Sequence, residues 1–73
     1  MRIVVIDKKI QGGEPVLRGT RVTVKTILAY LGNGVSTKDL SSRYKKNGIY
    51  ITTKDISNAL LYASTNMGGN NGN

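Results

Sequence analysis

The chain has 73 residues, which is the length of one small domain and too short for a two-domain enzyme. It contains no cysteine and no histidine, which excludes disulfides, thiol chemistry, the usual zinc sites and imidazole catalysis. Eleven Lys and Arg against four Asp and Glu give a formal net charge of +7, which favours polyanions or an acidic protein as partners. We therefore expect a protein that is not an enzyme and that has no cofactor and no metal site.

No apolar run approaches the roughly 18 residues of a membrane-spanning helix. The apolar run near the start of the chain, residues 3–6, is also too short for a secretory signal. We therefore expect a cytoplasmic protein with no membrane partner. Because a chain of about 60 residues buries only about 60% of its unfolded surface, the core is thin and a homodimer would add stability.

Two extended segments are expected within residues 1–22. Residues 3–6 form a run of β-branched side chains between charged residues, which predicts a short strand. That strand is either buried on both faces or paired at a dimer interface. Pro15 predicts a second extended segment over residues 14–18, and a pair of glycines at 12–13 forms the turn between them.

Three helices are expected over residues 23–65. The first begins at Thr23, whose hydroxyl can cap free amides, and it ends at the glycines and asparagine of residues 32–34. Its apolar residues recur at helical spacing; they are Val24, Ile27, Leu28 and Leu31. The third helix, which runs to residue 64 or 65, places an apolar face on the core; that face is Ile56, Ala59, Leu60 and Ala63.

The second and third helices each begin with a capping box and a hydrophobic staple. The boxes pair Ser36 with Asp39 and Thr52 with Asp55, and the staples pair Val35 with Leu40 and Ile51 with Ile56. These signals place the second helix at about residues 37–46. They also explain both aspartates as helix caps, not as a general acid pair or a metal site.

The expected fold is therefore mainly α, with short N-terminal β segments followed by a tri-helical, homeodomain-like helix-turn-helix bundle. We expect a single domain over residues 1–65. Residues 66–73 are rich in glycine and asparagine and lack apolar periodicity, so we expect a disordered tail there.

The second and third helices have the outline of a helix-turn-helix, in which the start of the last helix enters the major groove of DNA. Asn can pair with adenine and Lys with guanine, and cations at the end of the preceding helix meet phosphates. The candidate DNA-binding residues are Thr53, Lys54, Ser57 and Asn58 on the third helix and Arg43, Lys45 and Lys46 on the second. The joint at residues 47–51 is longer than the usual tight turn, which counts against a standard docking.

Other surfaces give weaker hypotheses. Leu61 and Tyr62 point away from the predicted apolar face and are candidates for binding a partner protein. Tyr30, Tyr44 and Tyr62 fall on separate helices, so partial burial is favoured over a stack of aromatic rings for single-stranded nucleic acid. A ribbon-helix-helix repressor is a minor alternative, because the strand at residues 3–6 offers no side chain that reads bases.

Residues 12–24, with the sequence GGEPVLRGTRVTV, resemble the signature of the domain-of-unknown-function 433 (DUF433) family, sometimes described as VapB-type antitoxins. The motif positions are Gly13, Pro15, Gly19, Thr20 and Arg21, and the resemblance extends over about residues 3–63. It implies a small homeodomain-like fold, often a dimer, that binds and neutralises a PIN-like ribonuclease toxin and represses its own promoter. Two departures are Thr23, where the family often has proline, and the longer joint at residues 45–50.

We therefore expect an antitoxin-like protein that dimerises through its N-terminal extended region. Its expected partners are a PIN-like toxin and double-stranded DNA. One alternative is a protein-interaction module without specific DNA binding, in which residues 12–24 build the docking surface. Another is a small accessory protein that binds nucleic acid, such as RNA.

Overall fold

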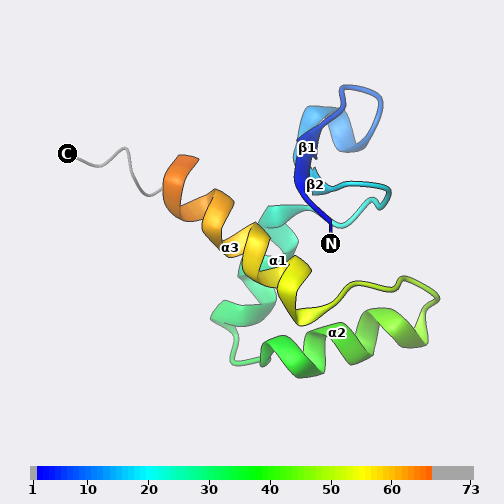
Figure 1. The fold of residues 1–73 in the computed structure, drawn as a ribbon, viewed down its shortest axis with the longest axis vertical. Coiled ribbons are helices and arrows are strands. Elements are labelled where there is room, and N and C mark those ends of the chain that lie inside the picture. The colour runs from blue at the N-terminus through cyan, green and yellow to red at the C-terminus, as the bar shows by residue number, and fades with distance from the viewer. Residues whose placement is uncertain (1, 67–73) are drawn as a thin grey trace.

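Two short strands precede three helices in the computed structural model, which describes residues 2–66 (Figure 1). Strand β1 spans Val4–Ile6, β2 spans Pro15–Leu17, and a 3-10 turn, η1, spans Gln11–Gly13 between them. Helices α1, α2 and α3 span Val24–Gly32, Thr37–Lys46 and Thr53–Asn66. This order confirms the expected mainly α fold with short β segments before a tri-helical bundle. Apart from its first residue, the tail predicted at 66–73 lies outside the described residues.

The two strands pair antiparallel, with Val5 opposite Val16 and Ile6 opposite Pro15. The Arg18 amide donates to the Ile3 carbonyl at 2.8 Å, so the backbone groups of the even-numbered residues of β1 point away from β2. Pro15 lies opposite Ile6, which is one of these even-numbered residues. The backbone nitrogen of Pro15 therefore faces away from β1, and the ladder requires no amide hydrogen there.

Strand β2 is the more buried of the two strands, because it lies between β1 and the segment that follows it. The Leu17 amide donates to the Val22 carbonyl at 3.0 Å, and Val16 forms an isolated bridge with Thr23. Within residues 2–66 no other segment pairs with the second edge of β1, and Ile6 is 61% exposed. The alternative that residues 3–6 are buried on both faces is therefore wrong.

All three helices begin where the cap signals predict. The hydroxyls of Thr23 and Ser36 accept from the amides three residues ahead, at 3.0 and 3.1 Å. At α3 the box is reciprocal: the Thr52 hydroxyl accepts from the Asp55 amide at 3.1 Å, and the Thr52 amide donates to the Asp55 carboxylate at 2.9 Å. These side chains satisfy amides that have no partner within the helix.

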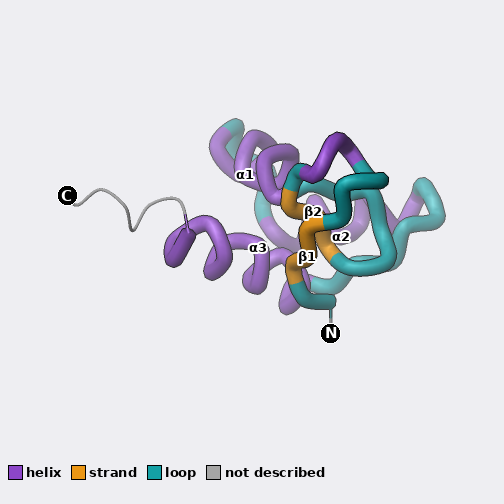
Figure 2. The backbone as a smooth tube through the Cα atoms, turned by 90° about the horizontal axis from the view of Figure 1, so that it is seen from above, coloured by secondary structure: helices purple, strands orange, loops and turns teal. Residues whose placement is uncertain are grey.

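The core takes residues from β2, from the loops and from each helix. Its buried members are Leu17, Val22, Val24, Ile27, Leu40, Ile51, Ile56 and Ala59. In Figure 2, β1 lies beside α3 and β2 beside α1, so the strands cover one side of the helices. None of the helices in residues 2–66 has the length and apolarity needed to cross a membrane.

One apolar position of α3 differs from expectation. Ile56 and Ala59 are buried, but Leu60 is exposed together with Leu61. The buried side of the helix includes Asp55 instead, because this residue contacts Arg2 in the segment that precedes β1.

Candidate nucleic-acid interface

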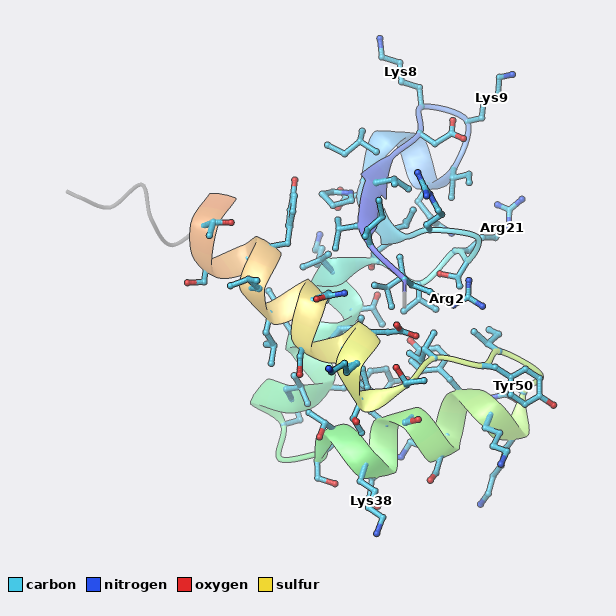
Figure 3. All side chains as sticks on the ribbon, in the orientation of Figure 1. Arg2, Lys8, Lys9, Arg21, Lys38 and Tyr50 are labelled. Carbon is cyan, nitrogen blue, oxygen red and sulfur yellow. The ribbon has the colours of Figure 1, made fainter. Side chains whose placement is uncertain are left out.

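A groove opens between the loop that follows β2 and the loop that precedes α3 (Figure 3). We call it the cationic groove. Its walls are residues 18–21 on one side and residues 48–50 and 52–55 on the other, and Arg2 and Ile10 complete its lining. Segments that are distant in the sequence therefore build it.

Arg2 joins the two walls of the cationic groove. Its Nη1 donates to the Arg18 carbonyl at 2.7 Å, and its Nε donates to the Tyr50 carbonyl at 3.3 Å. Its backbone amide donates to Asp55 Oδ1 at 2.7 Å. The guanidinium is thus held by both loops, and it fixes the width of the groove.

Asp55 is the one carboxylate among the described residues that line the groove, and it is only 2% exposed. Burial would raise its pKa, but hydrogen bonds from the amides of Arg2 and Thr52 and from the Thr52 hydroxyl hold the pKa below its usual value. Arg2 Nε lies 4.0 Å from Asp55 Oδ2. The ionised carboxylate is therefore balanced by Arg2 and leaves the other cations of the groove unpaired.

The wall at residues 18–21 is a tight turn built by the family motif. Gly19 has φ +78°, and a Cβ there would lie 2.9 Å from Arg2 Nη1. The Thr20 hydroxyl donates to the Leu17 carbonyl at 2.8 Å and accepts from the Val22 amide at 3.0 Å. The glycine and threonine therefore shape the turn, and the exposed arginines on either side of them carry its charge.

Two other motif residues shape the hairpin before this turn. Gly13 closes η1 with φ +89°, a conformation that other residues resist. Pro15 begins β2 at a position where no ladder hydrogen bond is required. Arg21 is the motif residue whose side chain is free in the described part of the chain, and it is exposed.

The opposite wall carries Tyr50, which is 64% exposed. The loop beneath it is anchored to α2, because the Ser41 hydroxyl donates to the Ile51 carbonyl at 2.6 Å and the Ile49 amide donates to the Tyr44 carbonyl at 2.9 Å. Figure 3 shows Tyr50 on one side of the opening and Arg2 and Arg21 on the other.

The candidate DNA-binding residues of α3 divide into two groups. Thr53 and Lys54 line the cationic groove, and Ser57 is exposed one turn further along the helix. Asn58 is half-buried, and its Nδ2 donates to the Arg2 carbonyl at 3.0 Å. The Asn58 amide is thus occupied within the fold, and its role in reading DNA stays a prediction.

The cations predicted on α2 lie apart from the start of α3. The Arg43 guanidinium carbon is 5.9 Å from the centroid of the Tyr30 ring, which packs edge-on against Tyr44 at 6.4 Å. Burial, followed by the nearby Tyr30, raises the pKa of Tyr44. Lys45 and Lys46 are exposed at the opposite end of the loop that leads to α3 (Figure 1).

Leu61 and Tyr62, the two residues predicted to bind a partner protein, differ in their exposure to solvent. Leu61 is 63% exposed, as expected for a contact surface. Tyr62 is half-buried against the core, because it lies one helical turn after Asn58 on the side that meets the N-terminal segment.

Sequence reasoning did not select Arg2, Arg18 or Tyr50 as site residues. A signal for Arg18 was present, since it and Arg21 flank a Gly-Thr turn that brings them to one wall. Nothing local to Arg2 or Tyr50 indicates that they meet across 48 positions of sequence.

The family described as "Protein of unknown function (DUF433)" matches residues 4–63 of the chain. A crystal structure of a DUF433 member protein from Anabaena variabilis ATCC 29413 is similar, with 30% sequence identity and a TM-score of 0.77. The similarity covers 90% of this chain but only 61% of that one, so this chain spans less than two thirds of the length of its structural neighbour. No curated protein matches the chain.

Proposed function

This chain belongs to the DUF433 family, whose function is unknown, and from its surface we propose that it binds nucleic acid through the cationic groove. The observation that carries the proposal is the charge of this groove. Arg18, Arg21 and Lys54 line it without an ion-pair partner among residues 2–66. Phosphodiester backbones are the polyanions that such a surface attracts most generally.

The start of α3 supports the same proposal. Its first turn opens into the groove, where Thr53 and Lys54 line the wall. The Asp55 amide is bonded to the Thr52 hydroxyl, so the support from this helix N-terminus comes from the positive end of the helix dipole, which favours phosphate groups. Lys54 and Ser57 are exposed on consecutive turns of α3; in this proposal Lys54 contacts a phosphate and Ser57 is positioned to reach a base edge.

The ligand implied by the family resemblance is duplex DNA of the protein's own promoter. The test is fluorescence anisotropy with this duplex and with a scrambled duplex of equal length, over a series of salt concentrations. The variant with Arg21→Ala and Lys54→Ala removes two phosphate contacts and should lower the slope of log affinity against log salt by about two.

The matched control changes the same charge outside the groove. Lys8 lies near the tip of the hairpin and Lys38 on the outer side of α2 (Figure 3). The variant with Lys8→Ala and Lys38→Ala should leave the slope nearly unchanged. Equal effects of the two variants would mean that net charge alone drives binding, and the groove would then have no special role.

A second candidate function is supported by a different surface. Leu60 and Leu61 are both exposed on α3, and α3 is the longest helix among residues 2–66. Adjacent exposed leucines favour contact with another protein, and the net charge of +7 favours an acidic one. We propose that this pair binds the PIN-like ribonuclease toxin implied by the resemblance, which would make the protein an antitoxin.

The two functions can be separated by reciprocal variants. Leu61→Ser should weaken co-purification with a toxin encoded beside this protein and leave DNA binding intact. The variant with Arg21→Ala and Lys54→Ala should do the opposite. Loss of toxin binding in both variants would argue against separate surfaces.

A homodimer remains part of the proposal. Arg2 is bound by α3 at the outer edge of β1, but the next outward-facing backbone groups, those of Val4 and Ile6, have no partner among residues 2–66. Such an edge can pair with an identical strand about a two-fold axis. The exposed Ile6 side chain would lie at that contact.

A further inference from the structure

Tyr50 differs from the other tyrosines of the chain. Tyr44 and Tyr62 are half-buried against the core, and Tyr30, which is 37% exposed, packs edge-on against Tyr44. Tyr50 is 64% exposed and makes no ring contact within residues 2–66. Its ring therefore adds little to the stability of the fold, although it sits on the wall of the cationic groove.

The backbone that carries Tyr50 is well anchored. Its carbonyl accepts from Arg2 Nε at 3.3 Å, and the residues on either side are bonded to α2. Ile51, the next residue, is almost fully buried. An aromatic ring on an anchored loop loses little conformational entropy when it binds a ligand.

The groove has room for more than one nucleotide. Its two adjoining lobes have volumes of about 720 and 550 Å³, and Arg2, Gly19 and Tyr50 line both. One lobe contains Arg18 and Lys54, and the other contains Arg21. Each lobe lies within the range of about 300–1,000 Å³ that accommodates small organic ligands. Cations therefore line both lobes, and Tyr50 lines both as well, so a base stacked on Tyr50 would have a cation in each lobe for its neighbouring phosphates.

We infer that the cationic groove binds single-stranded nucleic acid, with an unpaired base stacked on Tyr50 and the flanking phosphates held by Arg18, Arg21 and Lys54. This inference rests on the proposed nucleic-acid binding and names its substrate class. Stacking on an aromatic side chain needs an exposed base face. A single strand offers such a face, whereas in a duplex each base face is covered by the neighbouring base pair. The net charge of +7 provides the electrostatic complement for the backbone.

The test compares four ligands by fluorescence anisotropy: twelve-residue strands of oligo(dT) and oligo(rU), a twelve-base-pair duplex, and a scrambled duplex. Tyr50→Leu should weaken binding to both single strands about tenfold, which corresponds to about 1.4 kcal/mol, and change duplex binding less than twofold. Tyr50→Phe should keep the single-strand affinity, because the stacking face remains. Leu61→Ala is the control for loss of an exposed apolar side chain outside the groove.

A spectroscopic measurement reports on the ring itself. The chain has four tyrosines and no tryptophan, so stacking on Tyr50 should quench part of the tyrosine fluorescence when oligo(dT) binds. This quenching should be absent in Tyr50→Phe although the strand still binds. A stronger affinity for oligo(rU) than for oligo(dT) would identify RNA as the ligand, through contacts to the 2′-hydroxyl.

The possible failures are distinct. If Tyr50→Leu binds single strands as well as the wild type does, or loses single strands and duplex equally, the inference is overturned and the proposed function survives. If the wild type binds none of the four ligands at low salt, both the single-strand inference and the proposed nucleic-acid binding are overturned.

Discussion

The Arg2 backbone amide donates to Asp55 Oδ1 at 2.7 Å and so ties the beginning of the chain to the first turn of α3, 53 positions away. The Arg2 carbonyl completes the link by accepting from Asn58 Nδ2 at 3.0 Å. Asp55 also closes the capping box with Thr52. One carboxylate therefore caps the start of α3 and also helps to hold the N-terminal segment on that helix.

The first prediction concerns the stability that Asp55 provides. The amides of Arg2 and Thr52 donate to different oxygens of Asp55, so Asp55→Asn replaces the acceptor of one of them with a donor that faces it. We expect the free energy of unfolding to fall by about 1–3 kcal/mol, measured by urea denaturation. Asp39→Asn is the matched control, because Asp39 is the exposed acid at the same position of α2, and this change should stay within about 0.5 kcal/mol.

The second prediction concerns pH. The folded-state pKa of Asp55 is lowered, so its contribution to stability is present above the unfolded pKa of about 3.9. That contribution is lost as the pH falls through the lower, folded pKa. The free energy of unfolding of the wild type should therefore decrease as the pH drops below about 4. Asp55→Asn should lose much of this dependence, and an unchanged pH profile would argue against the ionised, hydrogen-bonded carboxylate.

The third prediction concerns the motif glycine. Gly19→Ala forces a side chain into a backbone conformation with φ +78° and places its Cβ 2.9 Å from Arg2 Nη1. We expect a loss of about 1–2 kcal/mol in thermal or urea unfolding, together with weaker nucleic-acid binding because Arg2 shifts. Gly32→Ala provides a control of opposite sign, since Gly32 is in α1 and a Cβ there would meet nothing within 4 Å beyond its chain neighbours and the backbone of its own helix. It should be neutral or stabilising.

Local signals account for the part of the fold that could be predicted from the sequence. The caps at Ser36 and Thr52 join groups three residues apart, and the glycines that end the helices act on their own neighbours. Such features require no knowledge of the tertiary structure, and the bounds of α2, Thr37–Lys46, agree with the prediction. The turn around Thr20 likewise uses hydrogen bonds that span two or three residues.

The cationic groove could not be predicted in the same way, because its contacts join distant segments. Arg2 reaches Arg18 over 16 positions and Tyr50 over 48. The hydrogen bonds of Arg2 also affect which side chains of α3 are available. Asn58 is of a type that reads bases, but its side-chain amide donates to the Arg2 carbonyl. The exposure of Leu60 has the same origin, since the side of α3 that meets Arg2 sets the orientation of the whole helix.

The last prediction concerns the outer edge of β1. The unpartnered backbone groups of Val4 and Ile6 and the exposed Ile6 side chain should bring two copies together, and sedimentation equilibrium of the wild type should give a dimer. Ile6→Lys places a charge at this edge on each copy, where the two would repel each other across the two-fold axis. We expect a monomer with an unchanged far-ultraviolet circular dichroism spectrum, because Ile6 is not part of the core. Leu61→Lys adds the same charge to α3 and should leave the dimer intact. A dimer that survives Ile6→Lys but dissociates with Leu61→Lys would move the interface from the sheet edge to α3.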